Sequence, residues 1–121
     1  MPPEQIAPVI EAIRAELAVT GRAIDADHYG ATVPFRFGDA DDPIVQRFAG
    51  AVRARGVTEG EPPLFVGDPK ELVERLRRTI AAGASKFVLI PLARGTREVF
   101  AQVDQLVAEV IPVVEAPGFA R

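Results

Sequence analysis

The chain has 121 residues, of which 48% are hydrophobic and 26% charged, and a formal net charge of −3. These values are typical of one folded domain rather than of a disordered segment. The chain contains no cysteine and one histidine, which excludes disulfides, thiolate nucleophiles and most cysteine or histidine metal sites. No apolar run is long enough to span a bilayer, and the first residues do not resemble a signal peptide, so we expect a cytoplasmic protein without a membrane partner.

One concentrated basic segment is present, formed by Arg75, Arg77 and Arg78. Two of these arginines follow Glu71 and Glu74 at helical spacing, which favours a solvated helix surface with salt bridges. A nucleic-acid-binding domain needs a broader basic face, and the net charge here is negative. We therefore expect no nucleic-acid partner.

Residues 3–20 are predicted to form an amphipathic helix. Gly21 follows as a stop signal, and Pro8 lacks the amide hydrogen that a helix interior uses, so the regular part is expected to begin late. The residues expected to face the core recur at helical spacing: Ile6, Val9, Ile10, Ile13 and Leu17.

Residues 28–37 are rich in side chains that favour extended backbone, which predicts a strand. Pro34 cannot donate a hydrogen bond to a sheet, so pairing is expected to be interrupted there. The loop that follows ends at Asp42 and Pro43, a helix cap and a first-turn proline, and predicts a helix through about Arg55. The residues expected to face inward on it are Ile44, Val45, Phe48, Ala51 and Val52.

Residues 56–63 are predicted to be a linker, and residues 64–66 a short strand. Asp68 and Glu71 match a capping box, which predicts the start of a helix that Gly83 ends. Residues 87–90 are continuously apolar, as expected for a strand that is covered on both faces.

The last predicted helix starts at Thr96, and Pro112 should end or kink it near Ile111. The residues expected to face inward on it are Val99, Phe100, Val103, Leu106, Val107 and Val110. Helices that alternate with extended segments predict a parallel sheet with right-handed crossovers.

Residues 21–30, 33–35, 67–71 and 83–88 together resemble, in order and spacing, the C-terminal portion of the luciferase-like monooxygenase superfamily, closest to its deazaflavin-using branch. The resemblance implies an α/β fold in which residues 1–121, as a single domain, form part of a (β/α)8 TIM barrel. The chain would hold the last two or so βα units, the equivalents of the seventh and eighth strands, with parallel strands and helices packed outside. Because a whole barrel needs about 250 residues, the first six strands would be missing.

The resemblance also implies an oxidoreductase or monooxygenase that uses a deazaflavin coenzyme or FMN and acts on a small molecule. A barrel gathers its site just beyond the strand ends, so Arg36, Pro91 and Arg94 are the candidate cofactor-binding residues. A guanidinium holds a phosphate or carboxylate well; the alternative is a loop arginine that is paired with Asp39 or Asp41 or is simply solvated. The family's catalytic residues lie on the missing strands, so the catalytic residues here are unknown.

His28 could serve as a general base, but it precedes its strand and so lies at the end opposite the expected site. A structural hydrogen bond or exposure to solvent is the favoured interpretation. The carboxylates of Asp39, Asp41 and Asp42 are interpreted as turn and cap residues, since no second cluster accompanies them, and no metal site is predicted.

Three functions are compatible with the sequence. The first is a truncated luciferase-like oxidoreductase of doubtful independent activity, and the second is a non-catalytic subunit or interaction module derived from the same scaffold. The third is a small protein that binds a flavin-like ligand at a subunit interface. Two open sheet edges are expected, which invite association, so we expect a homo-oligomer or a partner chain that completes the sheet.

Overall fold

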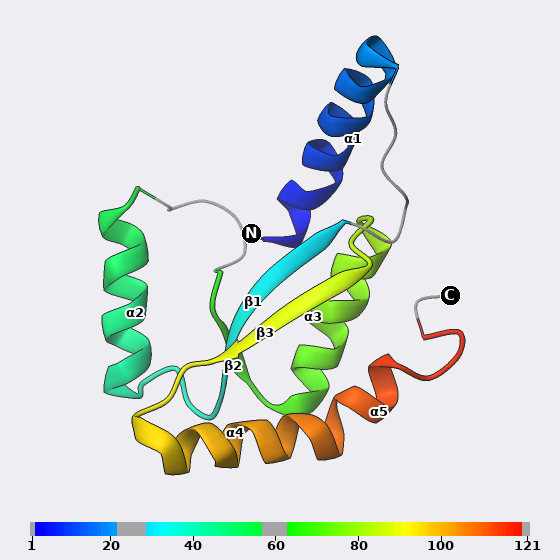
Figure 1. Cartoon of the computed structure of the whole chain (residues 1–121). Coiled ribbons are helices and arrows are strands. Elements are labelled where there is room, and N and C mark those ends of the chain that lie inside the picture. The colour runs from blue at the N-terminus through cyan, green and yellow to red at the C-terminus, as the bar shows by residue number, and fades with distance from the viewer. Residues whose placement is uncertain (1, 22–28, 57–62, 120–121) are drawn as a thin grey trace.

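The computed structural model describes residues 2–21, 29–56 and 63–119 (Figure 1). Helices and strands alternate along most of this length, as the sequence predicts. The elements in chain order are α1 (Pro3–Thr20), β1 (Gly30–Phe37), α2 (Pro43–Ala54), β2 (Phe65–Gly67), α3 (Pro69–Ala81), β3 (Lys86–Pro91), α4 (Gly95–Glu109) and α5 (Ile111–Val114).

The three strands form one parallel sheet in the order β2-β1-β3. The long strands β1 and β3 are neighbours, with Val33 opposite Leu89, and the register continues through the proline at position 34. The short strand β2 pairs with the end of β1, with Phe65 opposite Phe35. The mixed α/β fold with parallel strands is therefore confirmed, whereas the expected interruption of pairing at Pro34 is wrong, because Pro34 stays in register opposite Ile90.

The main core lies between one face of the sheet and the helices α3, α4 and α5. Figure 1 shows α3 behind β1 and β3, with α4 crossing below them. Successive side chains of a strand point to opposite faces, so alternate residues of β1 enter this core, and Phe35 is fully buried. The buried members of the core are Val33, Phe35, Phe37, Phe65, Leu72, Val73, Leu76, Leu106 and Val110.

The other face of the sheet is open. Val88 and Ile90 on β3 are 59% and 48% exposed. Their partners across the ladder, Thr32 and Pro34, are exposed and half-buried respectively. The prediction that β3 is covered on both faces is therefore wrong for this chain, because no described helix packs against this side. We call these four residues the open sheet face.

The capping box that starts α3 is confirmed. The Glu71 amide donates to Asp68 Oδ1 at 2.8 Å, and the Asp68 amide donates to Glu71 Oε1 at 3.2 Å. Two helix-terminal amides that would otherwise lack partners are thereby satisfied. The predicted break at the end of the chain is also confirmed, since α4 ends at Glu109 and Pro112 lies in the first turn of α5.

The helix α1 begins earlier than predicted. It is helical from Pro3 and carries Pro8 inside it, at the cost of one amide donor. The side chains of Ile6 and Ile10 pack with Tyr29 and Ala84 in a second, smaller core. Val9, expected to face inward, is 40% exposed, because this core takes only a narrow stripe of the helix.

The expectations for inward-facing residues on α4 and α2 are confirmed only in part. On α4, Phe100 and Val107 are 63% and 57% exposed, because the sheet and α3 cover only the opposite side of the helix. On α2, Val45 is buried as expected, Ile44, Phe48 and Val52 are half-buried, and Ala51 is exposed. Figure 1 shows α2 to one side of the sheet rather than across it.

The basic segment on α3 is only partly a solvated surface. Arg75 is 2% exposed, and its Nη2 atom donates to the Pro63 carbonyl at 3.3 Å. The neighbouring Arg77 does pair with Glu74, at 3.2 Å, and the Nη1 atom of Arg77 donates to the Phe119 carbonyl at 2.7 Å. The expectation of an exposed Arg75 is wrong because this position belongs to the buried stripe of the helix. In the described part of the chain, no helix combines the length and apolarity that crossing a bilayer requires.

Candidate functional site

Arg36 is the penultimate residue of β1, and its side chain leaves the sheet on the same side as the open sheet face. Its Nη1 atom donates to the Leu92 carbonyl at 2.8 Å and to Glu98 Oε1 at 2.9 Å. Its Nη2 atom donates to Asp42 Oδ2 at 3.1 Å. The side chain is 11% exposed, so these contacts hold a largely desolvated cation.

Asp42 caps the amino end of α2 and joins that helix to Arg36. Its Oδ1 atom accepts from the Ile44 amide at 3.0 Å and also from the guanidinium of Arg94. The hydrogen bond from Arg94 is the main reason that the pKa of Asp42 falls from 3.8 to about 2, and the Ile44 amide adds to it. Asp42 is therefore ionised throughout the physiological range of pH.

Arg94 and Glu98 belong to the start of α4. Arg94 precedes its first residue, and Glu98 lies in the first turn, 3.6 Å away. The hydrogen bond from Arg36 is the main cause of a lowered pKa at Glu98, and the hydrogen bond to Asp42 raises the pKa of Arg94. We call Arg36, Asp42, Arg94 and Glu98 the ion cluster.

The ion cluster joins the ends of three elements at the carboxyl edge of the sheet. It contains two cations and two anions, so its formal charge is zero. Each guanidinium already donates to carboxylates of the cluster, which satisfies these charges internally. The arrangement is suited to holding β1, α2 and α4 together.

Two of the predicted site residues, Arg36 and Arg94, meet in the ion cluster. Their partner is Asp42, whereas the sequence suggested Asp39 or Asp41. Pro91 ends β3 opposite Phe35 and makes no contact with the cluster that the structure records. The prediction for His28 lies outside the described residues.

Glu98 was missed by the sequence interpretation. Its spacing of four residues from Arg94 was the available signal, since such pairs adjoin on a helix. The contact between Glu98 and Arg36 could not be found this way, because 62 residues separate them in the sequence. That contact follows from the parallel pairing of β1 and β3, which carries the start of α4 to the end of β1.

An open hollow of about 430 Å³ lies at the carboxyl ends of β1 and β2. Three carboxylates line it, from Asp39, Asp68 and Glu71. Two of these already cap α3 through the capping box. The lining contains no cationic side chain, so the hollow disfavours a phosphate.

The residues present do not by themselves fit the phosphate of a flavin or deazaflavin. Arg36 is enclosed by its own partners, Arg94 donates to Asp42, and the hollow at the ends of β1 and β2 is acidic. Pro91 has no amide hydrogen to offer. Within residues 2–21, 29–56 and 63–119, no group of three histidine, cysteine or acidic side chains is placed to hold a metal ion.

Comparison of the chain with protein-family models, with curated proteins and with solved structures finds no match. The luciferase-like resemblance therefore depends on the sequence segments alone.

Proposed function

We propose that this chain is a non-catalytic sector of a parallel α/β assembly built on the luciferase-like oxidoreductase scaffold. The observation that carries this proposal is the open sheet face. Purely parallel sheets are almost always covered on both faces, yet Val88 and Ile90 are about half exposed here. In a (β/α)8 barrel this face would be the barrel interior, which other strands fill with side chains.

The outer edge of β3 also has backbone groups that could pair with a further strand. The Lys86 amide donates to the Tyr29 carbonyl just before β1 at 3.3 Å, and the Leu92 amide donates to the Phe35 carbonyl of β1 at 2.8 Å. Because backbone groups alternate in direction along a strand, the amides and carbonyls of Phe87 and Leu89 point away from β1. An added strand from outside residues 1–121 would pair with them and extend the apolar face.

The ion cluster supports a structural role for the carboxyl edge. A site that binds an anionic cofactor needs cationic donors that the protein leaves free. Here Arg36 is 11% exposed and is held by Asp42 and Glu98. The cluster therefore favours a scaffold that positions helices over one that binds phosphate.

A second candidate function is an oxidoreductase-family protein that binds FMN or a deazaflavin coenzyme with the residues of this chain. The side chain of Arg94 favours it, since it is 41% exposed at the edge where barrels bind their cofactors. In this case Arg94 would exchange Asp42 or Glu98 for a phosphate.

Titration of the purified chain with FMN, and separately with a deazaflavin coenzyme, tests the two candidates. The fluorescence of each compound reports binding, and Arg94→Ala is the matched variant. The proposal predicts no saturable binding by either protein. Saturable binding by the native chain that Arg94→Ala abolishes would contradict it and establish the second candidate.

A further inference from the structure

The outward side of α4 carries exposed apolar residues although no described element packs against it. Phe100 and Val107 lie seven residues apart on this side and are 63% and 57% exposed. Ala101 and Ala108 are exposed beside them. The buried residues of the helix lie on the opposite side, where Gln102 and Leu106 face the sheet and α3. Figure 1 shows the helix along the lower end of the molecule with nothing drawn beneath it.

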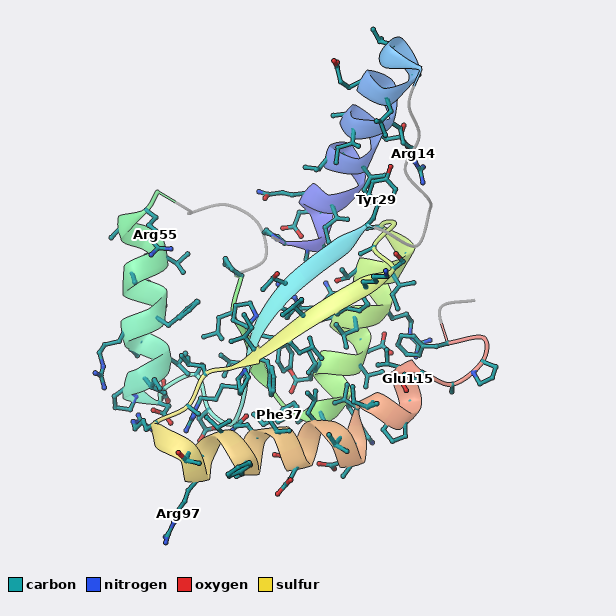
Figure 2. The ribbon with its side chains drawn as sticks, in the orientation of Figure 1. Arg14, Tyr29, Phe37, Arg55, Arg97 and Glu115 are labelled. Atoms are coloured by element: carbon teal, nitrogen blue, oxygen red, sulfur yellow. The ribbon has the colours of Figure 1, made fainter. Side chains whose placement is uncertain are left out.

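Two opposite charges flank the aromatic residue on this side. Arg97 lies three residues before Phe100 and Asp104 four residues after it, so both are neighbours of the ring on the helix surface. Neither side chain has an ion-pair partner among the described residues. In Figure 2 Arg97 projects from α4 away from the body of the molecule.

From this arrangement we propose that the outward side of α4 binds a second copy of this chain, with the two α4 helices antiparallel about a twofold axis beside Phe100. In that packing Arg97 of one copy lies opposite Asp104 of the other, and the symmetry makes this pair twice. Phe100 packs against Ala101 of the second copy, where the small side chain lets the helices approach.

The charges of Arg97 and Asp104 favour a second copy whose α4 helix runs antiparallel to the first. A parallel pair would place Arg97 against Arg97 and Asp104 against Asp104, which repel. The antiparallel pair converts both contacts into attractions without any further partner. The α4 helix is 15 residues long, so the interface is small, and the dimer is expected to depend on protein concentration.

This interface is separate from the open sheet face, which carries the proposed function. The dimer interface uses residues of α4 alone, whereas the strand added in the proposed function would pair with β3. A failure of one proposal therefore leaves the other intact.

Sedimentation equilibrium of the whole chain tests the interface with a charge exchange. Arg97→Asp places like charges at both contacts, and so does Asp104→Arg, so each variant should dimerise at least about tenfold more weakly than the native chain. An equimolar mixture of the two variants restores both attractive pairs and should dimerise about as tightly as the native chain. Arg47→Asp, at an exposed position of α2, is the matched control and should leave dimerisation unchanged.

The absence of native cysteines allows a second readout that does not depend on charge. Ala101→Cys places a thiol beside the axis and should give a covalent dimer on mild oxidation. Ala108→Cys, two turns further along the same side, should not. A native chain that stays monomeric, charge variants that dimerise like it, or a mixture that fails to recover would each overturn the proposal, as would equal cross-linking at the two positions.

Discussion

The side-chain amide of Gln102 on α4 makes two hydrogen bonds to the backbone of Phe37, the last residue of β1. The Phe37 amide donates to Gln102 Oε1 at 2.7 Å, and Gln102 Nε2 donates to the Phe37 carbonyl at 3.1 Å. The register places these backbone groups on the side of β1 where β3 has already ended. The glutamine therefore continues the ladder with its side chain, and Figure 2 shows Phe37 directly above α4.

Replacement of Gln102 should be costly for this reason. Gln102→Leu keeps the approximate volume but leaves a buried amide and a buried carbonyl without partners, which should lower the free energy of unfolding by roughly 2 to 4 kcal/mol. Urea unfolding measures the change. Gln105→Leu, at an exposed position of the same helix, is the control and should shift stability by less than about 0.5 kcal/mol. Equal effects at the two positions would contradict the structural role of Gln102.

Asp42 should make the stability of the chain depend on pH. Its pKa in the folded protein is about 2, below the ordinary 3.8, so the unfolded state binds the proton more readily. The stabilisation is complete above pH 3.8 and is lost as the pH falls through 3.8 to about 2. Asp42→Asn keeps an oxygen that can cap α2 but removes the charge.

The measurement is the unfolding free energy of the native chain and of Asp42→Asn between pH 2 and pH 6. The native chain should be the more stable of the two near pH 6, and the difference should shrink as the pH falls toward 2. High salt should reduce the difference at pH 6, because the cluster is partly exposed. A difference that is constant over the whole range would show that the charge of Asp42 contributes nothing.

Gly83 should tolerate no side chain. Its φ of +116° lies in the region that favours glycine, and a Cβ atom would lie 2.7 Å from Cδ1 of Ile10 on α1. Gly83→Ala should cost about 1 to 3 kcal/mol. The clash with Ile10 can be relieved, because the atom concerned is the end of a flexible side chain. The main cost is therefore the backbone strain at a positive φ, and adding Ile10→Val should recover little of the loss.

The helical Gly50 is the matched glycine for this test. A Cβ atom there meets nothing within 4 Å, and its φ is not positive. Gly50→Ala should therefore stabilise the chain by about 0.5 to 1 kcal/mol. Thermal or urea unfolding of the three variants checks the signs, and a stabilising Gly83→Ala would contradict the observed turn.

A charge should be tolerated on one side of β3 and not on the other. Val88 is 59% exposed on the open sheet face, whereas Leu89 packs against the main core. Val88→Lys should change the free energy of unfolding by less than about 0.5 kcal/mol, and Leu89→Lys should reduce it severely because a charge enters the core. Comparable losses in the two variants would show that the open sheet face is covered within the chain itself.

The parts of the fold that local chemistry determines were predictable from the sequence. The capping box of Asp68 and Glu71 and the break before Pro112 each depend on residues within one turn of each other, and both are present. The parallel pairing was predictable from the alternation of elements. The order β2-β1-β3 was not, because it depends on contacts between distant segments.

The errors have a common physical cause. Helical periodicity marks every apolar position but does not say how wide a stripe the rest of the fold can cover, so it places Phe100 and Val107 in the core although both are exposed. The same limit applies to Arg75, which was expected on the surface although its position faces inward. For the ion cluster, the sequence identified Arg36 and Arg94 as candidates but not that Asp42 and Glu98 would neutralise them.

The unpaired edge of β3 can be tested by amide hydrogen exchange, followed by NMR on the isolated chain. The open edge predicts slow exchange at Val88 and Ile90, whose amides point toward β1 like those of Lys86 and Leu92. It predicts exchange close to that of an exposed amide at Phe87 and Leu89, which point to the unpaired edge. Equal protection at all four amides would contradict the open edge and the proposal that further strands complete this sheet.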